Sequence, residues 1–318
     1  MNKLLFALSL LLFGCNGFTQ KSTHVVAFYN VENLFDTIDQ PHNDDEFLPK
    51  GKNRWTSARY LDKIKKMNQV IDSMGSVTLL GMCEIENAQV LKDLNDASST
   101  RKNFKIVHYE STDGRGVDVG MIYDPTVLKL VTSGFLRFQT NNPETPNTRD
   151  IVWGKFVHKK DTLFAMVNHW PSRRGGAEQS EPNRLKAAEM AASFIDSVQK
   201  ASPKSKIVFM GDLNDYPTDK APKIISERLN PMITKSSGKF GGSYSYKNEW
   251  DVLDHIMISK NGTKGSFRFV KNSGKIISND FLIEEFKGNL VPKRNYAGDR
   301  YLDGYSDHLP VKVGVVLK

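Results

Sequence analysis

The chain has 318 residues, of which 39% are hydrophobic and 10% aromatic, with 44 Lys and Arg against 36 Asp and Glu. Enough apolar side chain is present to form a core and the net charge of +8 is modest, so the composition excludes an intrinsically disordered protein. Two cysteines are too few for a disulfide-stabilised scaffold, and the basic balance favours an anionic partner without naming one.

The first 20 residues have the composition of a secretory signal peptide. Lys3 precedes residues 4–13, which are almost all apolar and too few to span a membrane. We therefore predict export to the periplasm, to the outer membrane as a lipoprotein, or to the medium, and no transmembrane helix in the mature protein. Two forms of processing are open. The four residues ending at Cys15 resemble a bacterial lipoprotein signal, and ordinary cleavage around residues 19–20 would instead release a soluble protein.

Residues 21–318 contain no low-complexity linker and no repeat, so we predict a single domain. Strand-sized apolar runs bounded by Gly, Pro, Asn or Asp recur along it. These runs are residues 25–29, 77–82, 104–109, 117–123, 151–157, 163–167, 207–210, 253–258 and 311–317.

Two segments between the strands, residues 58–74 and 183–198, place apolar side chains at helical spacing. In the first of them, Lys63, Lys65 and Lys66 are expected to lie mostly outside the apolar stripe. Many strands with few amphipathic helices indicate an α/β protein. We predict a four-layer α/β/β/α sandwich of two packed mixed sheets with outer helices.

Polar side chains occur where these strands end or begin. The short motifs at these positions are Asn30 to Asn33, Cys83-Glu84, Asn168-His169, Gly211 to Asn214, Asp254-His255 and Ser306 to His308. A solvated loop often supplies an acid or an amide at one strand end, but six such ends indicate a common purpose. Because strand ends at one edge of a sheet converge, we expect these groups to form one cleft. His255 should point to the opposite face of its strand from Asp254, away from that cleft.

The chemistry of this set is that of carboxylates, amides and imidazoles, without a convincing cysteine ligand. Hard oxygen ligands such as Glu32, Glu84 and Asp307 suit Mg²⁺, with Mn²⁺ or Ca²⁺ as alternatives, rather than a thiolate zinc site. Phosphoester hydrolysis needs this mixture: a metal ion to neutralise charge, a base to deprotonate water, and proton donors near the leaving oxygen.

In their order along the chain, the six motifs resemble the endonuclease/exonuclease/phosphatase superfamily, the fold of pancreatic deoxyribonuclease and exonuclease III. The resemblance spans most of the mature chain. Residues 28–36 and 168–172 look most like the exported bacterial members. A single motif such as Gly-Asp-x-Asn is weak evidence, whereas the ordered set is specific.

The resemblance implies a metal site. Glu84 would be the main ligand, and Glu32, Asn30 and Asp307 would complete the coordination directly or through water.

The resemblance also implies roles around the phosphate. Asp212 would orient or deprotonate the attacking water, and Asn214 would hold a phosphate oxygen. His308, paired with Asp254, and His169 would contact the scissile phosphate as imidazole donors or acid–base groups.

Three further positions have two interpretations each. Asp118 lies near where relatives carry an acid that orients the residue matching His169, or it faces solvent on its strand. Arg149 resembles an arginine that clamps phosphate, or it forms a surface ion pair. Many relatives carry a basic or amide residue two places after the metal glutamate. Here Glu86 would either repel a closely approaching phosphate backbone or provide another ligand.

The leading hypothesis is an exported, monomeric, metal-dependent phosphodiesterase, an endonuclease that hydrolyses DNA or RNA by in-line attack of an activated water. The superfamily also contains phosphomonoesterases and phosphodiesterases acting on phospholipids or inositol phosphates, which are the alternatives. A non-catalytic binding protein is a third possibility.

Several basic or aromatic segments are candidates for contact with a polyanion. They are Lys159-Lys160, Arg173-Arg174, Lys293-Arg294 and the polar region 262–304, which is either a substrate-reading insertion or a set of additional edge strands.

Overall fold

The computed structural model describes residues 24–41, 44–140 and 147–318. The predicted signal peptide and the predicted lipid site at Cys15 lie outside these residues. No helix within the described ranges has the length and hydrophobicity of a membrane span.

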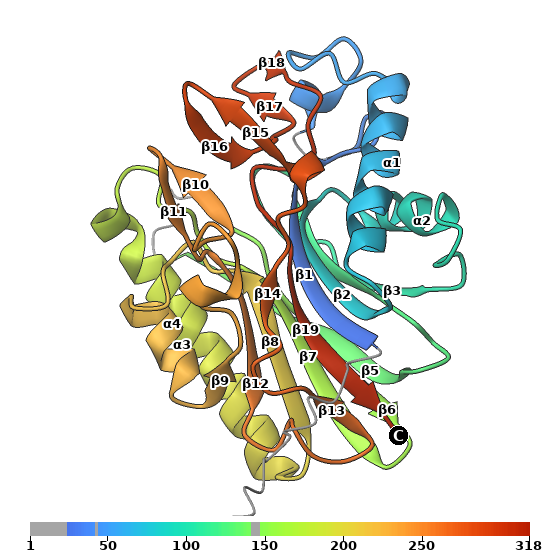
Figure 1. Ribbon diagram of the computed structural model, residues 1–318, viewed down its shortest axis with the longest axis vertical. Helices are drawn as coiled ribbons and strands as arrows, with labels where there is room; N and C mark the ends of the chain where they lie inside the picture. The colour runs from blue at the N-terminus through green and yellow to red at the C-terminus, as the bar shows by residue number, and fades with distance from the viewer. Residues whose placement is uncertain (1–23, 42–43, 141–146) are drawn as a thin grey trace, which may run out of the picture.

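Two mixed β-sheets lie face to face at the centre of the molecule (Figure 1). The first sheet contains, in order, β13 (Phe267–Phe269), β19 (Val311–Leu317), β1 (His24–Leu34), β2 (Val77–Ile85), β4 (Asp118–Tyr123) and β3 (Lys105–His108), with β14 (Lys275–Ile276) also on β19. The second contains, in order, β5 (Lys129–Leu136), β6 (Ile151–His158), β7 (Asp161–His169), β8 (Lys206–Asp212), β12 (Asp254–Ser259) and β9 (Leu229–Pro231). The pairs β1–β2 and β7–β8 are parallel, and the other pairs are antiparallel.

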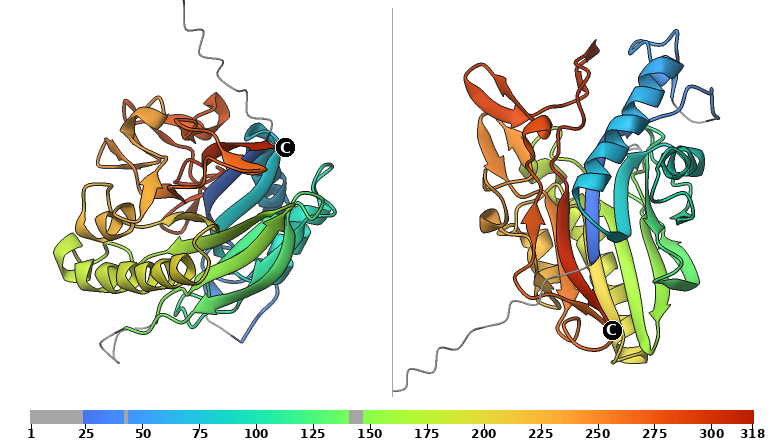
Figure 2. Two further views of the ribbon diagram at one scale, coloured as in Figure 1. Left: turned by 90° about the horizontal axis from the view of Figure 1, so that it is seen from below. Right: turned by 45° about the vertical axis from the view of Figure 1, so that its right-hand side comes forward.

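Helices cover the outer face of each sheet (Figures 1 and 2). The first sheet carries α1 (Ser57–Ser73) and α2 (Ala88–Asp96), and the second carries α3 (Ala177–Ala201) and α4 (Lys220–Ser226). This arrangement confirms the predicted four-layer sandwich. All nine predicted strands and both predicted helices are present. The strand β5 has largely exposed or half-buried side chains, and the helices α2 and α4 are short, so the apolar pattern did not indicate them.

The sheets approach closely beneath the ends of β2 and β8. A Cβ atom on Gly81 would lie 2.8 Å from Met210 Sδ and 2.9 Å from Val167 Cγ2, both on the second sheet. A larger residue at position 81 would push Met210 and Val167 away, so glycine lets the two sheets lie close together here.

Three hairpins project beyond the sandwich at one end (Figure 1). They are β10 (Tyr244–Tyr246) with β11 (Glu249–Asp251), β15 (Ile283–Phe286) with β16 (Asn289–Pro292), and β17 (Tyr296–Ala297) with β18 (Arg300–Tyr301). Short 3₁₀ helices η1 (Asp45–Phe47), η2 (Lys235–Ser237) and η3 (Asp280–Leu282) lie in the connections. In region 262–304, β13 and β14 are additional strands of the first sheet, and two of the hairpins form an insertion whose contact with substrate stays a prediction.

Candidate active site

The register of the second sheet places three of the predicted residues side by side. In the parallel pair β7–β8, His169 is opposite Asp212, and in the antiparallel pair β8–β12, Asp212 is opposite Asp254. Directly opposed residues share a face of the sheet. Asp212 therefore lies between an imidazole and a second carboxylate at the edge where β7 and β8 end.

The first sheet completes this group from the facing side. His308, just before β19, shares a hydrogen bond of 2.8 Å between its Nδ1 and Asp254 Oδ2 on β12. On β1, Asn30 Nδ2 donates to Asp212 Oδ2 over 3.1 Å. Ser306 Oγ links these contacts, because it donates to the Asn30 carbonyl and accepts from the His308 amide.

Asp212 faces two imidazole rings. Its Oδ2 lies 3.6 Å from Nε2 of His169 and 3.6 Å from Nε2 of His308. Its other oxygen, Oδ1, accepts from the Asn214 amide over 2.9 Å. All three ionisable groups are almost fully buried. Ligand-type atoms of Asp212, Asp254 and His308 lie within 4.8 Å of one another.

Burial and neighbouring charges separate the pKa values of these groups. Burial raises the pKa of Asp212 to about 7 against the attraction of His308. Burial alone would lower the pKa of His308, but the carboxylates of Asp254 and Asp212 raise it well above its usual value. For His169, burial and the charge of Arg149 lower the pKa, so this ring is neutral at neutral pH. The site thus holds a charged donor and a proton acceptor next to each other.

The predicted metal ligands leave the strands at irregular backbone positions. Glu32 has φ +50° and Glu84 has φ +61°, and β-bulges interrupt the β1–β2 ladder after Asn30 and the β2–β4 ladder after Cys83. Residues other than glycine rarely adopt this left-handed backbone conformation. Bulges next to active sites redirect side chains, which here turns the two carboxylates out of the regular alternation.

Two arginines lie against the same carboxylates. Arg294 Nη2 is 3.1 Å from Asp307 Oδ2, and its Nε is 3.6 Å from Glu32 Oε1. Arg115 Nη2 is 3.4 Å from Glu84 Oε2. Burial and the neighbouring Asp307 raise the pKa of Glu32 to about 7. Carboxylate oxygens are the ligands that a hard divalent cation such as Mg²⁺ prefers, so the donor types of Glu32, Glu84 and Asp307 fit such an ion. Among the described residues, these three carboxylates do not form a group whose ligand atoms all lie within 4.8 Å of one another.

A thiol-based metal site is not favoured. Cys83, His169 and Asp212 have ligand-type atoms within 4.8 Å of one another. However, Cys83 is buried, and burial raises the pKa of its thiol well above the usual value, so the thiolate that binds metal is disfavoured.

Neither interpretation of Asp118 is seen: its side chain is buried rather than facing solvent, and its hydrogen bonds do not go to His169. Asp118 instead hydrogen-bonds His108 Nε2 over 3.0 Å and accepts from the Ser111 amide over 2.9 Å. β3 pairs with β4 so that His108 lies opposite Gly120, two residues from Asp118 along the neighbouring strand. Within the described residues, Nδ1 of His169 has no hydrogen-bond partner.

Two predicted phosphate ligands bind the protein itself. Arg149 Nη2 and Asn214 Nδ2 both donate to the carbonyl of Trp170, over 2.9 Å and 3.0 Å. Arg149 Nη1 also pairs with Asp113 Oδ2 over 3.1 Å. These contacts hold the side chains of Arg149 and Asn214 against the loop after β7, beside the site.

Two residues lie outside the site. His255 is buried and hydrogen-bonds the carbonyl of Asp215 over 2.9 Å, in line with its exclusion from the cleft. Glu86 is also buried, and its carboxylate accepts from the Asp36 amide over 2.7 Å. Because its side chain is buried away from the site, Glu86 gives no reason to expect repulsion of a long phosphate backbone.

Two residues beside the site were missed from the sequence. The ring of Tyr244 lies 4.8 Å from that of His308, and burial raises the pKa of Tyr244 to about 12; no sequence pattern indicated this contact. Lys63 was expected mostly outside the apolar stripe of α1, and this was wrong, because it is buried beneath the helix. Its spacing from Tyr60 and Met67 was a signal for that position.

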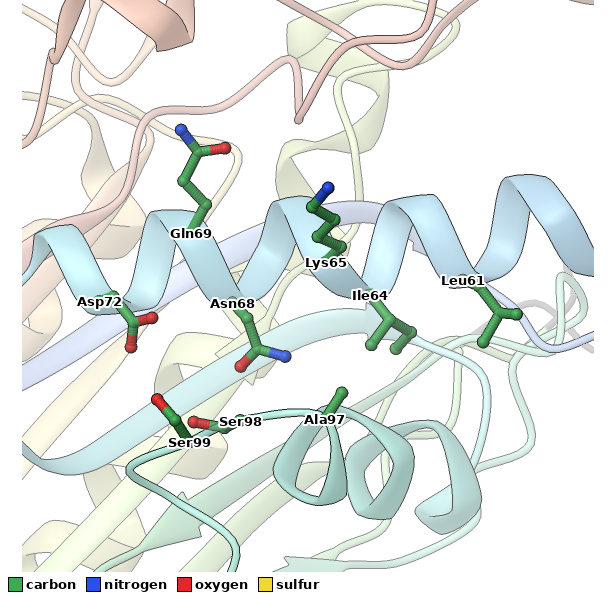
Figure 3. Close-up of a pocket in the computed structure, with 9 residues that line it drawn as sticks. All are labelled: Leu61, Ile64, Lys65, Asn68, Gln69, Asp72, Ala97, Ser98 and Ser99. Atoms are coloured by element: carbon green, nitrogen blue, oxygen red, sulfur yellow. The ribbon is translucent and has the colours of Figure 1, made fainter.

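A groove of about 480 Å³ lies elsewhere, between α1 and the loop after α2 (Figure 3). It is lined by Leu61, Asn68 and Ser99 among others, and it contains none of the predicted site residues.

The fold and the site together define a phosphoester-hydrolase type of protein, and comparison with known proteins agrees. The model of the Endonuclease/Exonuclease/phosphatase family matches residues 25–316. The chain therefore belongs to this family, whose members are phosphoester hydrolases and commonly use divalent metals. No curated protein matches the chain.

Solved structures share the fold at low identity. A family member from Bacteroides thetaiotaomicron is 16% identical with TM-score 0.59, over 92% of this chain and 95% of its own. The mannosyl-6-phosphatase of Bacteroides thetaiotaomicron VPI-5482 is 16% identical with TM-score 0.58, over 92% and 99%. The catalytic domain of human Nocturnin, with bound sulfate, is 14% identical with TM-score 0.55, over 92% and 94%.

The pairing of His308 with Asp254 has a measurable consequence. Asp254→Asn removes a charge that holds His308 protonated, so the pKa of His308 should fall. NMR titration of the imidazole resonances measures this change. The matched control is Asp118→Asn, which alters the partner of His108 and should leave the titration of His308 unchanged. A pKa of His308 that does not respond to Asp254→Asn would contradict the described geometry.

Proposed function

We propose that the protein is a metal-dependent phosphodiesterase that hydrolyses nucleic acid, and that it acts as an endonuclease. The observation that carries this proposal is the position of Asp212. It lies 3.6 Å from two imidazoles, one of which is paired with Asp254, at the end of the sandwich where the predicted metal carboxylates lie. Such an arrangement can activate water, stabilise charge on a phosphate and protonate a leaving oxygen.

Each residue group has a defined task in this proposal. A divalent ion held by Glu84, Glu32, Asp307 and Asn30 would neutralise charge on the phosphoryl oxygens. Asp212 accepts the proton of the attacking water.

The imidazoles act on the phosphate. Protonated His308 donates from Nε2 to the phosphate or to the leaving oxygen, while Asp254 fixes the ring through Nδ1. Neutral His169 hydrogen-bonds a second phosphate oxygen on the opposite side of Asp212.

Charge and aromatic groups around the site support a nucleic-acid substrate. Arg115 lies against Glu84 and Arg294 against Asp307, and the ring of Tyr244 lies 4.8 Å from that of His308 at an interplanar angle of 35°. Tyr246 follows on the same face of β10 with 59% of its surface exposed, where a base can stack on it. By contrast, Lys159-Lys160 lie at the start of β7, at the opposite end of the strand from His169.

A phosphomonoesterase is the second candidate, because the segment around Arg294 covers part of the site. Arg294 contacts both Glu32 and Asp307, and the amides of Asn295 and Tyr296 donate to the Glu32 carboxylate. Such a cover favours a small substrate over a long polymer. One protein with this fold is a mannosyl-6-phosphatase.

Activity on a substrate panel tests the mechanism. We expect Mg²⁺- or Mn²⁺-dependent hydrolysis of DNA or RNA that EDTA abolishes. His308→Ala and Asp212→Asn should each reduce kcat by about 10²–10⁴-fold, because each removes a proton-transfer group. The control His24→Ala changes a histidine at the far end of β1 and should retain activity.

The same panel separates the candidate functions. Hydrolysis confined to sugar phosphates or other phosphomonoesters would favour the second candidate over a nuclease, and hydrolysis confined to phospholipids or inositol phosphates would favour a lipid-directed enzyme. Full activity of His308→Ala on every substrate would contradict the mechanism. Nucleic-acid binding without turnover under any metal ion would indicate a binding protein.

We propose further that the protein is exported as a monomer, with lipid attached at Cys15. Metabolic labelling with palmitate and cell fractionation test the attachment. Wild-type protein should carry label in the membrane fraction, and Cys15→Ala should lose both label and membrane association. A wild-type protein that is unlabelled and recovered in the soluble exported fraction would show ordinary cleavage instead.

A further inference from the structure

We propose that Lys63 is a positioning residue that holds together the two chain segments carrying the metal ligands Glu32 and Asp307. The inference rests on the proposed metal-dependent hydrolysis. The segments are the end of β1 and the loop before β19, which are far apart in the sequence and adjacent in space.

The contacts of Lys63 join these segments directly. Its Nζ donates to the carbonyl of Glu32 over 3.3 Å and to the carbonyl of Tyr305 over 2.5 Å. Tyr305 stands two residues before Asp307. The Lys63 ammonium group therefore holds the backbone of Glu32 and the backbone two residues before Asp307.

The burial of Lys63 indicates a specific role. The side chain is 1% exposed, and it lies on the inner stripe of α1 between Tyr60 and Met67. A buried lysine costs desolvation, and an apolar residue of similar size is often as stable in such a position. Packing alone therefore does not account for a lysine at this place.

Glu32 needs external support, because its backbone is in the left-handed region. Such a conformation persists only when surrounding contacts determine it. The Glu32 carboxylate accepts hydrogen bonds from the backbone amides of Asn295 and Tyr296, and the Glu32 carbonyl accepts one from Lys63 Nζ. Loss of Lys63 removes the donor to the Glu32 carbonyl and the link to Tyr305, while the Glu32 and Asn33 amides keep their bonds to Asn30 and Glu84. The Glu32 ligand should therefore lose part of its orientation.

Besides Arg294, which contacts the carboxylates of both ligands, a further bridge between the segments serves a different residue. Ser306 Oγ donates to the Asn30 carbonyl and accepts from the amide of His308. It therefore positions the imidazole, whereas Lys63 acts on the Glu32 and Asp307 side. This division predicts that Lys63 influences metal binding more than it influences the affinity for substrate.

Calorimetric titration of the metal-free protein with Mn²⁺ tests the proposal. Lys63→Met keeps the length of the side chain and removes its charge and donors. We expect its Kd for Mn²⁺ to rise about 10–100-fold, the usual effect of losing a group that orients a ligand. At saturating metal, KM for the substrate should stay within about twofold. The matched control is Lys65→Met, two positions along α1 on the exposed face, which should bind Mn²⁺ like the wild type.

A second variant guards against misfolding. If Lys63→Met does not fold, Lys63→Gln is used instead, because its side-chain NH₂ group can still donate to a carbonyl. It should weaken Mn²⁺ binding by a smaller factor than the change of about 10–100-fold expected for Lys63→Met. Wild-type Kd in a folded Lys63→Met or Lys63→Gln variant would overturn the role of Lys63 while leaving the proposed function intact. Wild-type protein that binds no Mn²⁺ would contradict the proposed function and this inference with it.

Discussion

The hydrogen bond between Asp254 and His308 joins the two sheets of the molecule, and the candidate site depends on it. Asp254 belongs to β12 of the second sheet, and His308 leads into β19 of the first. The bond from Asn30 to Asp212 crosses the same interface. Buried ionisable groups are tolerated only when they are paired. These two bonds between the sheets therefore give the buried ionisable groups of the site their partners.

Regular strands and irregular ends have different tasks in this fold. The apolar runs fix the sheets and their register, which sets His169, Asp212 and Asp254 in one row. The positions with positive φ, at Glu32 and Glu84, lie where the ladders are interrupted. A regular strand would alternate its side chains between the two faces. The bulges remove that limit, and the hydrogen bonds around each glutamate maintain the bent backbone.

Sequence patterns predicted the layers and the side chains that gather around Asp212, since both depend on local signals: an apolar run for each strand and a polar motif at its end. The partner of Asp118 could not be predicted in this way, because it depends on which strand lies next to β4. The burial of Lys63 was accessible from helical spacing, but its two carbonyl partners come from distant segments. The contact of Tyr244 with His308 depends on a hairpin docking across the site.

The central claim is that carboxylates from both ends of the chain bind one divalent cation beside the Asp212, Asp254 and His308 group. Anomalous diffraction from a crystal grown with Mn²⁺ tests it most directly. The account predicts a manganese peak bounded by oxygens of Glu84, Glu32 and Asp307, with Arg294 displaced from its present contacts. A peak within the cluster of Asp212, Asp254 and His308, or no peak near either set, would contradict it.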